Sequence, residues 1–87
     1  MTSEGSAGEP PPSDAAISAA VAATLRDHAD VVAGWLQGTP KSWGFLAGKA
    51  VGAARRSLGR DLSYGERRRV WSSLWEELEL LARTTQR

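Results

Sequence analysis

Three glycines, at positions 44, 48 and 52, are the residues whose type and spacing say most about the chemistry of this chain. They recur every fourth residue in a stretch that otherwise has the composition of a helix. Four cations lie in the same stretch: Lys41, Lys49, Arg55 and Arg56. An interior glycine disfavours a helix by about 1 kcal/mol relative to alanine, so three such positions cost about 3 kcal/mol. A bare backbone beside cations lets a phosphate group come close, and phosphate binding is the chemistry that this pattern indicates.

A helical wheel with about 100° per residue separates an apolar sector from a basic sector over residues 40–58. The apolar sector is expected to face a core: Trp43, Leu46, Ala47, Ala50, Val51, Ala54 and Leu58. The glycines fall in the basic sector together with Phe45, whose ring offers a stacking surface for a base or a sugar. The same small-residue stripe is equally typical of a tight crossing between helices, with Phe45 covering a neighbour. Both interpretations remain open from the sequence alone.

More arginines lie just beyond this helix. One group ends the helix or follows it: Arg55, Arg56 and Arg60. A second group opens the last predicted helix: Arg67, Arg68 and Arg69. Cations at a helix N-terminus are disfavoured by the macrodipole, by about 0.3–1 kcal/mol per exposed group, so stability alone favours acids there. Because a short turn separates the two groups, we expect them to form one patch.

The basic residues are concentrated in the middle of the chain. Residues 41–69 hold eight bases and two acids, for +6, whereas residues 1–40 hold five acids and one arginine, for −4. A basic block of this kind is either a solvated face or an electrostatic footprint for phosphates or an acidic partner. The chain has no cysteine, which excludes disulfides and thiolate metal sites.

The elements that must position these residues are all helical. An apolar stripe at alternating spacings of four and three marks the first helix: Val21, Leu25, His28, Val32 and Trp35. Gly38 is expected to end this helix and Gly59 the second, while Ser63 and Glu66 form a capping box that starts the third. The third helix has its own stripe: Val70, Trp71, Leu74, Trp75, Leu78 and Leu81.

These signals predict an all-α fold, a small three-helix bundle at residues 14–83 with a disordered N-terminal tail. The expected helices are 14–36, 40–58 and 64–82, preceded by an acidic, Pro- and Gly-rich tail at 1–13 and followed by a frayed end at 84–87. The start of the chain lacks the basic and apolar pattern of a signal peptide, and no segment is apolar enough to cross a bilayer. We therefore expect a cytoplasmic protein without membrane contact.

One run resembles a known family. Residues 38–48 contain Gly38-x-x-Lys41-x-x-Gly44-Phe45-Leu46-x-Gly48. This run is similar to the tail domain of the B subunit of bacterial Asp/Glu-tRNA amidotransferase, the GatB/YqeY family, over about residues 38–54. The resemblance implies a small helical module that touches the outer corner of a tRNA. It would give that role to matched positions: Lys41, Gly44, Phe45, Gly48 and Lys49. Residues 55–59 and the tryptophan-rich last helix depart from the family's pattern.

Reactive groups suited to catalysis are few. His28 is the only histidine and falls on an apolar stripe, where a packing role is the expectation. No catalytic residue, metal site or cofactor is predicted, and the chain is not expected to be an enzyme. The four tryptophans are expected to fill the core, with an aromatic interface as the alternative.

The sequence therefore predicts a non-catalytic module that binds structured RNA, tRNA or rRNA, through the glycine-lined basic face and the arginines. The expected binding residues are Lys41, Gly44, Phe45, Gly48, Lys49, Gly52, Arg55, Arg56, Arg60, Arg67, Arg68 and Arg69. The alternative is a protein assembly subunit that docks a partner helix on the glycine stripe and the tryptophans. The pattern leaves the oligomeric state open.

Overall fold

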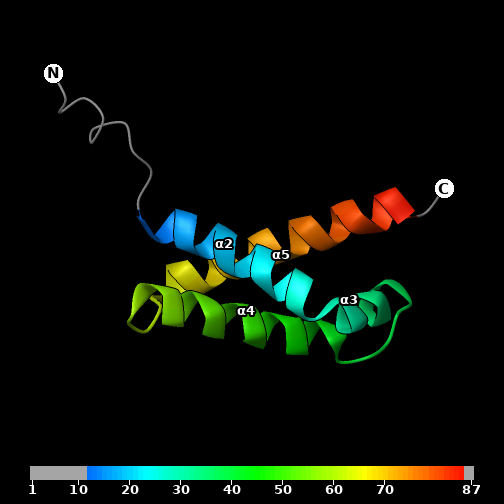
Figure 1. Ribbon diagram of the computed structural model, residues 1–87, viewed down its shortest axis with the longest axis horizontal. Helices are drawn as coiled ribbons and strands as arrows, with labels where there is room; N and C mark the ends of the chain where they lie inside the picture. The colour runs from blue at the N-terminus through cyan, green and yellow to red at the C-terminus, as the bar shows by residue number, and fades with distance from the viewer. Residues whose placement is uncertain (1–11, 86–87) are drawn as a thin grey trace, which may run out of the picture.

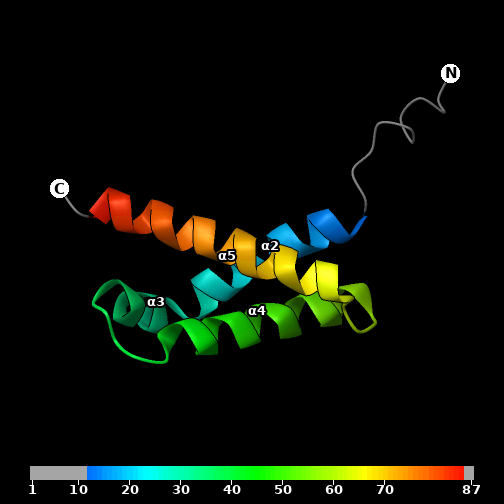
Figure 2. The same cartoon turned by 180° about the vertical axis from the view of Figure 1, so that it is seen from behind.

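The computed structural model describes residues 12–85, which form four helices. Their bounds are α2 Pro12–Asp27, α3 Ala29–Leu36, α4 Ser42–Leu58 and α5 Tyr64–Thr85. No strand occurs in this part of the chain, so the predicted all-α class is confirmed. In Figure 1, α2 and α5 cross each other and both pack along α4, while α3 lies at the end where α4 begins. Figure 2 shows the same crossing from behind, with α5 in front.

The prediction of three helices was wrong because the first one is divided at His28. This residue leaves helical geometry, with φ −124° and ψ 45°, and its carbonyl accepts hydrogen bonds from the amides of both Val31 and Val32. The apolar stripe runs through the break without a proline or glycine to mark it. Asp27, His28 and Asp30 are, however, weak helix formers, and such a segment yields to tertiary packing at low cost.

The other helices occur where they were predicted, and their first and last residues differ by a few positions. Pro12 and Ser13 belong to α2, although they were assigned to the tail, and residues 1–11 of that predicted tail lie outside the described residues. Helix α4 begins two residues later than expected. Helix α5 continues to Thr85, so the end predicted to fray at residue 84 is helical there. Gly38 and Gly59 adopt positive φ angles, 84° and 73°, and end α3 and α4 as predicted.

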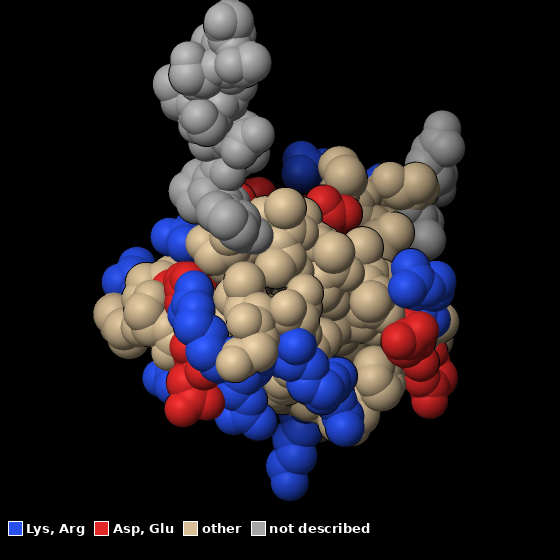
Figure 3. Space-filling view, turned by 60° about the vertical axis from the view of Figure 1, so that its left-hand side comes forward, with Lys and Arg blue, Asp and Glu red and all other residues tan. Residues whose placement is uncertain are grey.

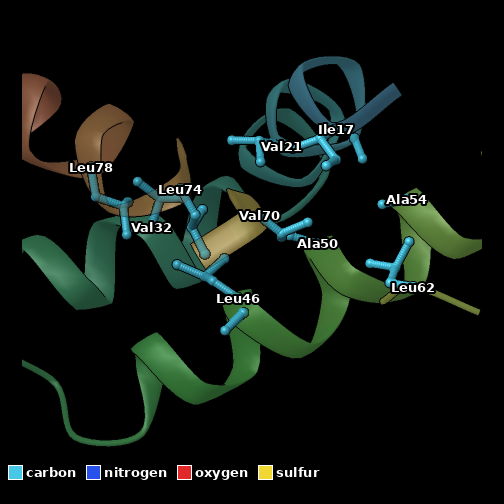
Figure 4. Close-up of a cluster of buried hydrophobic side chains, with 12 residues drawn as sticks. Ile17, Val21, Val32, Leu46, Ala50, Ala54, Leu62, Val70, Leu74 and Leu78 are labelled. Carbon is cyan, nitrogen blue, oxygen red and sulfur yellow. The ribbon is translucent and has the colours of Figure 1, made fainter. Parts of the chain in front are cut away.

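The core lies where α2, α4 and α5 meet (Figure 4). Five of its side chains are the largest that are fully buried: Leu46, Leu74, Leu78, Val21 and Val70. Helix α4 adds Ala50 and Ala54, whose small side chains let α2 come close. Since the buried residues of α4 follow the four-residue spacing of its apolar sector, the opposite side of this helix is left to solvent.

Candidate nucleic-acid interface

The glycine track of α4, formed by Gly44, Gly48 and Gly52, faces outward. Apart from the helix's own turns, no atom of residues 12–85 lies within 4 Å of where a Cβ would stand at Gly44 or Gly48. At Gly52 the one neighbour within that distance in the described chain is the guanidinium of Arg56, at 3.6 Å. The glycines therefore do not serve a helix crossing within this bundle. Of the two interpretations that the sequence left open, the structure therefore supports the exposed track over the helix crossing.

The cations of α4 share this outward side. The 17 residues of α4 include Lys49, Arg55 and Arg56 and no acidic residue. All three are exposed, as is Lys41, which precedes the helix in the left-handed conformation with φ 72°. Figure 3 shows Lys and Arg side chains gathered over the lower part of the end of the molecule that bears the α4–α5 loop. The face combines bare backbone with positive charge, which is the pairing that phosphates require.

Phe45 lies at the edge of the glycine track, and its ring contacts two neighbouring side chains, His28 and Lys49. Its ring meets the ring of His28 edge to face, with centroids 5.2 Å apart and an interplanar angle of 79°. The ammonium of Lys49 lies 5.3 Å from the centroid of the Phe45 ring. The side chain still has 43% of its surface exposed. His28 is therefore a packing residue, as predicted, and Phe45 is an oriented aromatic surface beside the cations.

Arg60 lies in the loop between α4 and α5 and is engaged within the fold. Its two terminal nitrogens donate to both carboxylate oxygens of Glu66, at 2.8 and 2.7 Å. Glu66 also completes the predicted capping box: the Ser63 amide donates to its carboxylate at 2.8 Å, and the Glu66 amide donates to the Ser63 hydroxyl at 3.1 Å. The Arg60 hydrogen bonds, followed by that from Ser63, lower the pKa of Glu66 to about 2. Arg60 thus joins α4 to the start of α5.

Arg69 also has partners in the fold. Its Nε lies 3.0 Å from the Asp14 carboxylate, and its Nη2 donates to the Ser13 hydroxyl at 3.2 Å. The pair ties the start of α5 to the start of α2. Arg69 is therefore directed toward α2 and not toward the glycine track of α4.

The other arginines of the predicted site are more loosely held. Arg55 has a distant ion pair with Asp61, at 3.8 Å, between two exposed side chains. Arg68 lies over the Tyr64 ring, 5.8 Å from its centroid, and Arg67 is exposed. The short loop after α4 brings both groups of arginines to the same end of the molecule (Figure 1). They do not form one continuous patch of free cations, because Arg60 and Arg69 are ion-paired.

The tryptophans gather in a partly exposed cluster beside the core, although core filling was the first expectation and an aromatic interface the alternative. The Trp75 ring packs edge to face against both Trp35 and Trp43, with centroids 5.6 Å apart in each pair. An open hollow of about 300 Å³ is lined by Trp43, Trp71 and Trp75, with Ser72 and Glu76 at its side. Trp71 and Trp75 keep 38% and 44% of their surface exposed, so the prediction that they fill the core was wrong. The signal was present: both follow a core residue by one position, which places them about 100° around the helix.

Residues 12–85 contain no group of three His, Asp or Glu side chains placed to hold a metal ion. No helix within this range has the length and apolar character needed to cross a bilayer. Comparison of the chain with protein families, with curated proteins and with solved structures found no match.

Proposed function

We propose that this chain is a non-catalytic module that binds structured RNA, tRNA or rRNA, through the outward face of α4. The observation that carries the proposal is the coincidence, on one face, of open glycine positions with cations and no acid. Internal packing does not account for the glycines, because nothing in the described bundle occupies the space above Gly44 and Gly48. Close approach of a ligand backbone does account for them.

The chemistry of the face fits a phosphodiester backbone. A phosphate on the glycine track meets the helix surface without intervening side chains, and Lys41, Lys49 and Arg56 border the track. Phe45 offers a partly exposed ring for stacking beside them. The resemblance of residues 38–54 to the GatB/YqeY tail domain supports tRNA as the first ligand to test, and a cytoplasmic location would place the chain with tRNA and rRNA.

The ion pairs within the fold separate the predicted binding residues into those that are held by a carboxylate and those that can contact RNA. Arg60 and Arg69 have carboxylate partners within 3.0 Å and act mainly as structural residues. The exposed cations on the side of the glycine track, none of which has a carboxylate partner within residues 12–85 closer than the 3.8 Å between Arg55 and Asp61, form the principal contact set: Lys41, Lys49, Arg55 and Arg56. Arg67 extends it onto α5, whereas Arg68 shares the flank of that helix with Tyr64.

The test is the salt dependence of tRNA binding, measured by fluorescence anisotropy with labelled bulk tRNA. Each phosphate contact contributes about 0.7–0.9 to the slope of log affinity against log salt. The double variant Lys49→Ala/Arg56→Ala is expected to lower the slope by about 1.5 and to weaken binding at low salt. Arg26→Ala, which removes an exposed cation from α2, is the matched control and should leave the slope unchanged. The proposal is overturned if the affinity for tRNA does not change with salt concentration. It is also overturned if the double variant and Arg26→Ala lose the same amount of affinity.

The exposed tryptophans favour a second candidate, an assembly subunit that binds a protein. Glu76 and Glu79 lie beside Trp75, so the tryptophan cluster repels phosphates and is no part of an RNA face. Purification of the tagged chain from lysate with and without nuclease separates the two functions. A stoichiometric protein that stays bound after nuclease treatment supports assembly, and loss of all bound material supports RNA binding.

A further inference from the structure

One flank of α5 carries a stripe that the bundle covers only in part. Tyr64, Arg68, Trp71, Trp75 and Glu79 follow each other at spacings of four, three, four and four, which places them on one side of the helix. Tyr64 has 67% of its surface exposed, and Trp71 and Trp75 are more than one-third exposed. A stripe of exposed aromatic residues at this spacing is typical of a helix that packs against another helix along its length.

The aromatic surface on this flank is large for a chain of this size. An aromatic side chain buries about 150–250 Å² when fully covered, so these three leave roughly 300 Å² exposed on one side of one helix. Trp75 is held by the rings of Trp35 and Trp43, so it is ordered before any partner arrives. Ordered aromatic residues of this kind are the usual anchors of protein interfaces.

The charges on the same helix select the partner. The flank carries Arg68 in the N-terminal half of α5 and Glu79 in the C-terminal half, where Arg83 is the one exposed cation among Glu76, Glu77 and Glu79. A second α5 laid antiparallel brings the basic half of each copy against the acidic half of the other. A parallel arrangement would bring like charges together. The flank is therefore complementary to itself in one orientation only.

We propose that two copies of this chain associate through antiparallel α5 helices, related by a twofold axis at the level of Ser73. This arrangement places Trp71 of each copy beside Trp75 of the other. It also places Arg68 within one residue of the position opposite Glu79 of the second copy. The glycine track lies on the outward side of α4, whereas Trp43 of that helix turns toward α5, so the pairing leaves the proposed RNA face free.

The experiment is sedimentation equilibrium of the full chain without nucleic acid, over a wide range of concentration. Arg68→Glu and Glu79→Arg each turn two opposite-charge pairs of the dimer into like-charge pairs, and each is expected to raise the dissociation constant about tenfold or more. The double variant Arg68→Glu/Glu79→Arg restores both pairs and should return to within about threefold of the unmodified chain. Glu77→Arg reverses an exposed charge on another side of α5 and should change nothing.

Circular dichroism of each variant confirms that the helices are intact. A chain that stays monomeric at every concentration overturns the proposal, and so does a double variant as weak as the single ones. Neither result bears on RNA binding, which depends on α4 and is measured separately. If the chain is monomeric and still binds tRNA, only the dimer proposal is refuted and the RNA-binding proposal stands.

Discussion

Replacing Gly44 and Gly48 together by alanine should stabilise this protein. Both residues are helical with no positive φ, and a Cβ built at either one meets open space. The substitution gains helix propensity of about 0.8–1 kcal/mol at each position, so the double variant should gain about 1.5–2 kcal/mol in the free energy of unfolding. At about 4–8 °C per kcal/mol for a domain of this size, Tm should rise by roughly 6–16 °C.

The assay is urea and thermal unfolding followed by far-ultraviolet circular dichroism. Gly59→Ala is the matched control, because Gly59 has φ 73° and a side chain there is strained by about 1–2 kcal/mol. The control should therefore be less stable than the unmodified protein. A loss of stability in the double variant would show that Gly44 and Gly48 meet something in the folded chain, and the argument for an open track would fail.

The same double variant should bind tRNA more weakly although it is more stable. Two methyl groups on the track hold a phosphate backbone away from the helix without changing any charge. Opposite effects on stability and affinity are typical of a position kept for binding. If tRNA affinity stays unchanged while stability rises, the glycines are not part of the contact.

Two further predictions concern the fold. The pKa of Glu66 is about 2 when folded, against an ordinary value of 4.5, so its stabilising contribution is present above about pH 4.5 and is lost as the pH falls toward 2. Urea midpoints of the protein and of Glu66→Gln should therefore converge over that range, and a constant difference would contradict the role assigned to the Arg60 pair. Leu74→Ala removes a fully buried side chain and should cost about 2–5 kcal/mol, whereas Leu80→Ala, on the exposed side of α5, should cost less than about 0.5 kcal/mol. Equal urea midpoints for these two variants would contradict the placement of the core.

Features determined by local sequence were predictable. The four-residue glycine spacing placed the track in the basic sector, opposite the apolar one, although a helix crossing stayed open as its use. Gly59 marked the end of α4, and the Ser63–Glu66 box marked the start of α5. These features depend on neighbours within one helical turn. Helix periodicity and capping chemistry act over that same distance.

Features that depend on distant neighbours were not predictable. The Arg69–Asp14 pair joins helices far apart in the sequence, and no local pattern shows that this arginine is occupied. The break at His28 interrupts a continuous apolar stripe. Trp71 and Trp75 lie at the edge of the core stripe of α5 on a wheel; that offset is a local signal, but the extent of their exposure depends on how far α3 and α4 cover that side.

The most direct test of the RNA-binding face is an amide nitrogen–proton NMR titration of the labelled protein with tRNA. Glycine amides resonate apart from most others, so each position can be followed separately. If RNA binds along the glycine track, the largest shifts fall on Gly44, Gly48 and Gly52, and the amide of Gly65, on α5, hardly shifts. Shifts centred on Trp71 and Trp75, with the three glycine amides of α4 unmoved, would contradict binding along the track.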